Sequence, residues 1–359
     1  MRHRSIRSLI SLVVLVTGLG MAGIALPGSS RAAGGTIVVT ESIQAAVDAA
    51  DPGDTVLVPA GTYAETVAVT EPGITIRGSQ GAVLDGSGLG LAFGIRVRSV
   101  DGSRLDGFTL DGLTIRGYTV SGIQVSGVDN FRLTGTRYVD NPLYGLFPVR
   151  CSHGRVDHNY VSGSFDSGVY VGQCTDVRVD HNLAHDNTIG LEVELSGRVV
   201  VEYNVSTRNA LGAVVQISPL RPVKVTDDVL VRRNVLSGNN QPNTITDESL
   251  LGMLPGGVGI VNVAGDRVRI LDNVVSGNRS AGIGMVGLPA TVVALDPALD
   301  PFPHGGEVRG NLAFGNGYDP DPRLAPLQGA DVVWDLTGSP CFEVRRGART
   351  FPAVLPSCA

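Results

Sequence analysis

The chain has 359 residues, of which 43% are hydrophobic and 17% are charged, and its formal net charge is −6. These values exclude intrinsic disorder, which requires low hydrophobicity and high net charge. The 48 glycines follow no Gly-X-Y period, which excludes collagen and favours a turn-rich all-β fold. A single lysine, dispersed arginines and the acidic balance exclude nucleic acid as a partner bound through its phosphates.

The N-terminal segment, residues 1–32, has the three-part pattern of a secretory signal peptide. Three arginines precede an apolar run over residues 9–26, and small residues follow at Ser30 and Ala32. Cleavage near Ala32 would release a secreted or extracytoplasmic protein. A membrane anchor is the alternative, because the run approaches the ~20 residues that a span needs. No later apolar run is that long, so we expect no membrane span after cleavage.

A repeat of about 23 residues dominates the chain after residue 105. A glycine followed by alternating apolar residues recurs at Gly122, Gly145, Gly168, Gly190, Gly212, Gly259 and Gly282. An asparagine three residues after Val or Ile recurs at Asn159, Asn182, Asn204, Asn234, Asn273 and Asn311. The alternation of apolar and polar residues within each unit predicts short β-strands with one buried face.

These units predict an all-β fold, a right-handed parallel β-helix over residues 33–317. Short strands without intervening helices cannot bury a face alone, whereas stacked units share one continuous core. We expect the valines to fill this core and the asparagines to form hydrogen-bonded ladders at the corners. Because Gly and Asn tolerate left-handed backbone, we expect these residues to form the corners themselves.

Both ends of a solenoid need caps. Residues 42–50 place apolar side chains on one face of a helical pattern, which predicts a short helix that covers the N-terminal end. Residues 318–359 break the repeat and are rich in proline. We expect this segment to form an irregular C-terminal cap.

Four cysteines follow the N-terminal segment, and an even number in an exported chain predicts disulfides. Cys151 and Cys174 each lie six residues after a repeat glycine, so they occupy one position in adjacent turns. A strand spacing of ~4.8 Å is compatible with a disulfide between the turns. Two free, buried thiols are the alternative. Cys341 and Cys358 would close a loop of the C-terminal cap.

The segment at residues 42–79 reads SIQAAVDAADPGDTVLVPAGTYAETVAVTEPGITIRGS. It resembles the opening of pectin-lyase-like right-handed β-helix proteins. The repeats at residues 105–316 are similar to the β-helix repeats of NosD-like and carbohydrate-processing members. The resemblance implies contact with a polysaccharide, frequently an acidic one. It implies no single activity, because this architecture occurs in lyases, hydrolases, epimerases and non-enzymatic proteins.

A first candidate site lies just before the corner asparagines. Its residues Arg155, Asp157 and His158 recur one turn later as Arg178, Asp180 and His181. Arg155 or Arg178 would clamp a sugar carboxylate, because guanidinium groups bind carboxylates through two hydrogen bonds. His158 would transfer a proton near neutral pH. The alternative, which we favour for this surface, is a solvated Arg–Asp ladder between neighbouring strands.

A second candidate site lies on the strands that follow the repeat glycines. Its side chains are Phe147, Asp166, Tyr170, Glu192, Glu194 and Gln216. Aromatic rings stack on sugars, and carboxylates bind hydroxyls or Ca²⁺ or act as acid and base at a glycosidic bond. Insertions at residues 218–228, 241–256 and 288–306 would form walls around this face. An ordinary exposed polar surface is the alternative.

The sequence therefore predicts an exported β-helix protein that binds or acts on an acidic polysaccharide. As a uronate lyase or C5-epimerase it would use Tyr170 or His158 for proton transfer. A non-catalytic carbohydrate-binding or structural protein and a NosD-like periplasmic accessory protein are the alternatives. Ca²⁺ stays open as a cofactor, and we expect a monomer without nucleic-acid partners.

Overall fold

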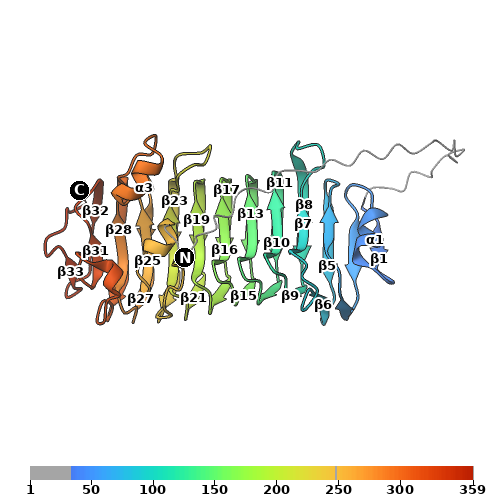
Figure 1. Cartoon of the computed structure of the whole chain (residues 1–359), viewed down its shortest axis with the longest axis horizontal. Helices are drawn as coiled ribbons and strands as arrows, with labels where there is room; N and C mark the ends of the chain where they lie inside the picture. The colour runs from blue at the N-terminus through green and yellow to red at the C-terminus, as the bar shows by residue number, and fades with distance from the viewer. Residues whose placement is uncertain (1–33, 247–248, 359) are drawn as a thin grey trace, which may run out of the picture. The chain divides into compact units, whose positions relative to one another are not determined.

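The computed structural model describes residues 34–246 and 249–358, so the predicted signal peptide lies outside the described residues. Residues 34–246 and 249–358 form a parallel β-helix whose turns stack along one axis (Figure 1). Most turns contribute one strand to each of three parallel sheets, which have 12, 11 and 10 described strands. The predicted fold is confirmed. Among the described residues, no helix is long and apolar enough to cross a membrane.

The 12-stranded sheet contains β1 (Thr36–Val38), β2 (Thr55–Val58), β5 (Ile74–Gly78), β8 (Leu105–Asp111), β11 (Val128–Thr134), β14 (Ser152–Asp157), β17 (Thr175–Asp180), β20 (Gly197–Glu202), β23 (Asp227–Arg232), β26 (Arg269–Leu271), β29 (His304–Arg309) and β32 (Ser339–Phe342). The 11-stranded sheet contains β4 (Val67–Val69), β7 (Phe93–Val97), β10 (Ser121–Ser126), β13 (Tyr144–Val149), β16 (Ser167–Gly172), β19 (Ile189–Glu194), β22 (Leu211–Gln216), β25 (Val258–Val263), β28 (Ala281–Val286), β31 (Ala330–Trp334) and β33 (Thr350–Phe351). The 10-stranded sheet contains β3 (Gly61–Tyr63), β6 (Ala82–Asp85), β9 (Thr114–Arg116), β12 (Arg137–Val139), β15 (Tyr160–Ser162), β18 (Leu183–His185), β21 (Val205–Thr207), β24 (Val235–Ser237), β27 (Val274–Ser276) and β30 (Leu312–Phe314). The helices are α1 (Ile43–Asp48), α2 (Leu250–Met253), α3 (Ala290–Leu295) and the 3₁₀ turn η1 (Pro322–Leu324).

The asparagine ladder that the sequence predicts forms, and a second one runs beside it. In the first ladder, the side-chain oxygen of Asn204 accepts hydrogen bonds from the backbone N–H of Asn182 at 2.9 Å and from its side-chain amide at 3.0 Å. The Asn204 amide in turn donates to Asn234 at 3.0 Å. The second ladder repeats this pattern from Asn187 onward. Asn204 thus satisfies backbone groups of the preceding turn and donates to the asparagine side chain of the following turn.

The prediction that asparagine itself takes the left-handed backbone at the corners is wrong for these ladders. The residue before the asparagine is left-handed instead, with φ of 57° at His158, 56° at His181 and 56° at Tyr203. The asparagine side chain must point inward to reach the next turn. The sharp bend therefore falls on the preceding residue, whose side chain points to solvent.

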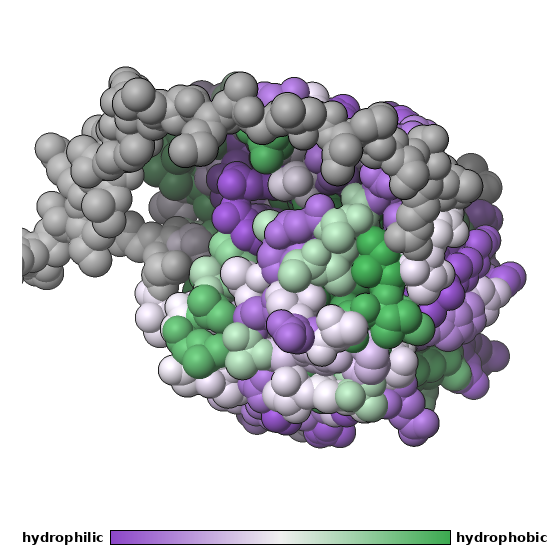
Figure 2. Space-filling model, turned by 90° about the vertical axis from the view of Figure 1, so that its right-hand side faces the viewer, coloured by the Kyte–Doolittle hydropathy of each residue, from purple (hydrophilic) through white to green (hydrophobic). Residues whose placement is uncertain are grey.

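Helix α1 lies at the N-terminal end of the β-helix and buries Ile43, Ala46 and Val47. The Ser42 side chain accepts a hydrogen bond from a backbone N–H of the first turn. The Glu65 carboxylate accepts from the backbone N–H of Ile43 at 2.8 Å. This end of the molecule shows hydrophilic and hydrophobic residues interspersed on its visible surface (Figure 2). The helix therefore covers core residues that the first turn would otherwise expose.

The cysteines form one of the two predicted disulfides. Cys341 and Cys358 are bridged, with their Cα atoms 4.8 Å apart. Cys151 and Cys174 lie in adjacent turns as predicted, but both are free and buried, so the predicted bridge between them is corrected to two thiols. Side chains that stack in parallel stay near the strand spacing of ~4.8 Å, whereas a disulfide needs Cβ atoms about 3.8 Å apart. The Cys174 sulfur accepts a hydrogen bond from the backbone N–H of Cys151 instead, at 3.2 Å.

Candidate functional site

The outer face of the 11-stranded sheet presents most of the aromatic and acidic side chains of the second candidate site. In β16, Val169 and Val171 pack in the core, so Tyr170 between them points to the outer face. The same alternation in β19 places Glu192 and Glu194 on that face. Strand pairing aligns Tyr170 with Glu192 in the next turn.

One column of outer side chains crosses this sheet from turn to turn, and we call it the central outer column. Its members are Arg96, Gln124, Phe147, Tyr170, Glu192, Val214, Val261 and Gly284. Successive members lie one strand spacing apart, ~4.8 Å. The column changes from basic to aromatic, then to acidic and finally to apolar. The chemistry of the face therefore depends on the position along the β-helix axis.

Three aromatic rings cluster on β13 and β16. The rings of Tyr144 and Phe147 stack with their centroids 4.3 Å apart. The Tyr170 ring lies 5.1 Å from that of Tyr144 and 4.8 Å from that of Phe147. Such contacts favour a fixed orientation of each ring. Phe147, predicted to stack on a sugar, therefore supports the two tyrosines through its ring contacts.

Glu194 accepts two hydrogen bonds from neighbouring hydroxyls. The Tyr170 hydroxyl donates at 2.9 Å, and the Ser218 hydroxyl donates to the other carboxylate oxygen. Glu194 lies at the end of β19, and Ser218 belongs to the first inserted segment. The insertion therefore helps to hold this carboxylate in one orientation.

Glu192 is only 2% exposed and lies two residues before Glu194 in β19, on the same face of the strand. The Ser167 hydroxyl and the Gln216 amide donate to it, the amide at 2.8 Å. Burial raises the pKa of Glu192 well above its usual range, and the nearby carboxylates of Asp166 and Glu194 raise it further. Glu192 therefore keeps its proton to a higher pH than an exposed glutamate does.

The two tyrosines keep their protons in this environment. Burial raises the pKa of Tyr144, and the charges of Asp166 and Glu192 raise it further. Burial raises the pKa of Tyr170 as well, followed by the charges of Glu194 and Glu192. Forming a phenolate beside carboxylates is unfavourable. Tyr170, predicted to transfer a proton, is thus suited to donate a hydrogen bond and poorly suited to release its proton or to remove one.

A cavity of ≈ 370 Å³ lies over these groups, and we call it the acid–tyrosine cavity. Its polar lining consists of Tyr144, Asp166, Glu194, Gln216, Ser218, Arg221 and Ser249. Apolar side chains from the second and third insertions, including Ile245, Leu250 and Val292, complete it. The predicted walls around this face are therefore present. Among the described residues, Arg221 is the only cationic side chain of this lining.

The insertions also bury what the sequence predicts to be an open ladder. Tyr170 is 5% exposed, and Gln216 is 2% exposed. An ion pair between Lys224 of the first insertion and Asp296 of the third connects two walls. The site is therefore a partly covered cavity that stays open to solvent, because the insertions fold back over the sheet.

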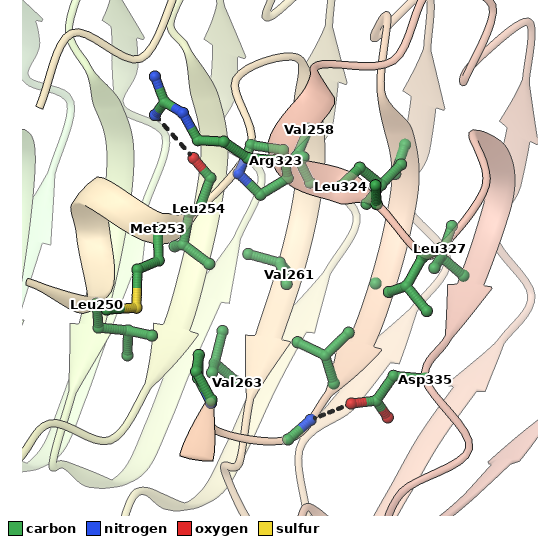
Figure 3. A pocket seen from close by; sticks show the side chains of 18 of the residues that line it. Leu250, Met253, Leu254, Val258, Val261, Val263, Arg323, Leu324, Leu327 and Asp335 are labelled. Atoms are coloured by element: carbon green, nitrogen blue, oxygen red, sulfur yellow. Dashed lines mark hydrogen bonds between the residues drawn. The ribbon is translucent and has the colours of Figure 1, made fainter. Parts of the chain in front are cut away.

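A second cavity, also of ≈ 370 Å³, lies farther along the same face over β25, β28 and β31 (Figure 3). Its lining is mostly apolar and includes Val261 and Val263, which continue the columns of Glu192 and Glu194. Leu250 of α2 lines both cavities. The acidic cavity thus borders an apolar one.

Arg155 and Arg178 lie on a different sheet from Tyr170, in β14 and β17. Arg155 donates two hydrogen bonds to Asp180, at 2.9 and 2.8 Å. Arg178 pairs with Glu202 at 2.7 Å. Both carboxylates are buried, and each needs this charge compensation. The predicted role as clamps for a sugar carboxylate is therefore not supported, and the alternative of an Arg–Asp ladder describes these residues.

His158 lies at the corner between the 12- and 10-stranded sheets. Its Nδ1 is 2.7 Å from Asp157, and its ring stacks on His181 with centroids 5.0 Å apart. His181 stacks in turn on Tyr203 at 5.2 Å. The structure thus does not bring His158 and Tyr170 into one site, because one projects from a corner and the other from the 11-stranded sheet.

The Arg–Asp ladder predicts a dependence of stability on pH. Burial alone would raise the pKa of Asp157, but hydrogen bonds from Arg132, His158 and Thr134 outweigh it and hold the pKa at about 2. The ionised Asp157 therefore stabilises the folded state above pH ~4, and this contribution is lost as the pH falls toward 2. We expect Arg132→Gln to lower the free energy of unfolding by about 2 kcal/mol at pH 7.

Urea denaturation at several pH values measures this effect. The difference between Arg132→Gln and the parent protein should narrow between pH 4 and 2. Arg77→Gln is the matched control, because Arg77 pairs with a partly exposed carboxylate, that of Asp111. A difference that is independent of pH would contradict this account of Asp157.

Sequence reasoning missed several residues of the acid–tyrosine cavity. Tyr144 directly precedes the repeat glycine Gly145, so its phase along the strand could have placed it beside Tyr170. Phe165, Ser218 and Arg221 lie outside the regular alternation. No periodic signal identifies residues of that kind. Among the described residues, no three His, Cys, Asp or Glu side chains are grouped as metal ligands.

The architecture agrees with a comparison against protein families. A family model described as "Right handed beta helix region" matches residues 72–233 and 121–293, together more than half of the chain. The chain belongs to the right-handed β-helix family. This membership confirms the predicted superfamily resemblance. No curated protein sequence matches the chain.

Several solved structures are similar to this right-handed β-helix. The A-module of a mannuronan C-5 epimerase from Azotobacter vinelandii is 16% identical, with a TM-score of 0.60, over 86% of this chain and 83% of that one. DFA-IIIase from Arthrobacter chlorophenolicus is 15% identical, with a TM-score of 0.54, over 86% and 89%. A pectate lyase is 13% identical, with a TM-score of 0.52, over 92% and 82%. At these identities the similarity establishes the fold.

Proposed function

We propose that this β-helix protein cleaves glycosidic bonds of a polysaccharide in the acid–tyrosine cavity. The observation that supports the proposal most directly is that Asp166 and Glu194 line one cavity together with Tyr144. Two carboxyl groups that flank a glycosidic bond are the usual catalysts of its hydrolysis. The similar structures include enzymes named for carbohydrate substrates, which is consistent with this proposal.

The proposed reaction assigns each group one task. Glu194 accepts hydrogen bonds from Tyr170 and Ser218, as an ionised carboxylate does, and would remove a proton from the attacking water. Asp166 would have to be in its protonated form for this reaction. It would then donate that proton to the leaving oxygen as the bond between that oxygen and the anomeric carbon breaks. Tyr144, which donates a hydrogen bond to Asp166, would orient it.

Uronate lyase or C5-epimerase activity is the second candidate. One observation favours it: Arg221 lines the cavity and has no ion-pair partner among the described residues, so it could bind a sugar carboxylate. These reactions also need a base that removes the C5 proton. Tyr144 and Tyr170 suit that task poorly because their pKa values are raised, and a carboxylate would have to act instead.

Product analysis distinguishes these functions. The protein would be incubated with polygalacturonate, alginate and neutral glucans. New reducing ends without ultraviolet absorbance support hydrolysis. Absorbance in the unsaturated-uronate band supports the lyase, and C5 proton exchange in heavy water supports the epimerase. Binding in affinity electrophoresis without any product would overturn the enzymatic proposal in favour of a carbohydrate-binding protein.

A further inference from the structure

Four arginines that are dispersed in the sequence come together near one edge of the 11-stranded sheet. Arg98 follows β7, Arg104 precedes β8, and Arg150 follows β13. These three line a cavity of ≈ 350 Å³ with the serines Ser99, Ser103 and Ser126, and no acidic residue lines it. Arg96 lies in β7, two residues before Arg98, and its guanidinium donates to the Gln124 side chain at 3.2 Å.

Two of the lining arginines have no acidic partner among the described residues. The Arg150 guanidinium donates only to the Ser126 hydroxyl, at 3.0 Å. Arg98 forms no side-chain hydrogen bond or ion pair with a described acidic residue. Arg104 is paired with Asp129, at 2.7 Å from its Nε. The exposed Asp101 nearby accepts hydrogen bonds from Ser99 and Ser103. The cavity therefore keeps an excess of positive charge.

The backbone fixes this arrangement. Arg150 is left-handed, with φ of 56°, and Gly102 and Gly127 of the lining are also left-handed. Arg104 donates a hydrogen bond to the backbone carbonyl of Arg150 at 2.9 Å. The loop of residues 98–104 is thus joined to the end of β13, and the guanidinium groups face one space.

The position of this cavity relates it to the acid–tyrosine cavity. Val149, next to Arg150, pairs with Gly172, which pairs with Glu194. Both cavities therefore lie toward the same ends of the strands, and Arg150 is two turns from Glu194 along the axis, roughly 10 Å. An extended polymer on this face would reach both.

We infer that the cavity of Arg98, Arg104 and Arg150 binds an anionic group, a carboxylate or sulfate, of the polysaccharide. The guanidinium N–H groups and the serine hydroxyls can donate hydrogen bonds to the oxygens of such a group. The inference rests on the proposed function only in taking the ligand to be a carbohydrate. The inference predicts that the substrate is anionic. The acid–tyrosine cavity by itself does not indicate this charge.

The test compares polymers that differ only in charge. Affinity electrophoresis would use polygalacturonate against fully methyl-esterified pectin, and dextran sulfate against dextran. We expect the protein to bind one anionic polymer at least tenfold more tightly than its neutral counterpart. The double variant Arg98→Gln/Arg150→Gln should lose this preference, and added salt should weaken it. The pair that shows the preference identifies the anionic group as carboxylate or sulfate.

Arg346→Gln is the matched control, since Arg346 is exposed in the C-terminal segment, away from this cavity. Equal affinity for charged and neutral polymers, or an unchanged preference in the double variant, would overturn the inference. Thermal denaturation verifies that both variants fold. Glu194→Gln should bind like the parent protein yet release product about 10²- to 10⁴-fold more slowly. Failure of the arginine cavity and failure of the proposed reaction therefore give different results.

Discussion

Glu194→Gln is expected to lower kcat on a cleaved polysaccharide by about 10²- to 10⁴-fold, which is the range for loss of a general acid or base. Glutamine has nearly the same shape. Its carbonyl oxygen can accept from one of the two hydroxyls, and its amide can donate to the oxygen of the other, so the fold should persist. It cannot take a proton from water. The measurement is the initial rate of reducing-end release at saturating polymer, together with a circular dichroism spectrum.

Glu343→Gln is the control for this prediction, because Glu343 is an exposed glutamate of the C-terminal segment. Asp166→Asn should lower kcat by a similar factor if one carboxyl group acts as the acid and the other as the base. A Glu194→Gln protein with the parent kcat would exclude Glu194 as a catalyst. Another residue of the cavity would then have to act as the base.

Asn209→Ala is expected to cause the largest loss of stability among single side-chain truncations in the ladders, about 3–5 kcal/mol. Asn209 is fully buried. Its oxygen accepts from the backbone N–H of Asn187 at 3.0 Å, and its amide donates to Asn239 at 3.0 Å and to the Ala184 carbonyl at 3.1 Å. Truncation removes the acceptor of the Asn187 N–H and the amide donor to Ala184, and it interrupts the ladder between two turns. The Asn239 side-chain oxygen keeps only the hydrogen bond from the backbone N–H of residue 209.

Urea denaturation measures this loss as a lower midpoint at an unchanged slope. Gln80→Ala is the control, because Gln80 is an exposed amide outside the ladders and its loss should change stability by less than about 0.5 kcal/mol. A loss below 1 kcal/mol for Asn209→Ala would mean that water or a neighbouring side chain replaces the missing amide.

The fold was predictable because its interactions repeat. Valines that alternate with polar residues, and asparagines at a constant offset from them, are sufficient to identify the strands and the ladders. The left-handed residues were not predictable in the same way. His158 and Tyr203 adopt that conformation because the next residue must point inward, and their own residue types do not indicate it. Whether Cys151 and Cys174 form a disulfide likewise depends on the directions of their side chains. Their spacing in the sequence does not give these directions.

The candidate site was predictable only in part. The alternation along β16 and β19 correctly places Tyr170, Glu192 and Glu194 on one outer face. Their enclosure depends on insertions that share no period with the repeat, so contacts such as that of Ser218 with Glu194 could not be foreseen. The ion pairs that Arg155 and Arg178 form with carboxylates depend on which strands are neighbours in the 12-stranded sheet. The sequence alone does not give these pairs.

The central outer column has no symmetry between its two ends. From β7 to β28 it presents guanidinium, amide, aromatic, carboxyl and then aliphatic groups in a fixed order. A sugar chain also has two unlike ends, so its two antiparallel placements on this face make different contacts. The face therefore has a polarity, and only one direction of threading can bring a given ring to the arginines and its neighbour to the carboxyl groups.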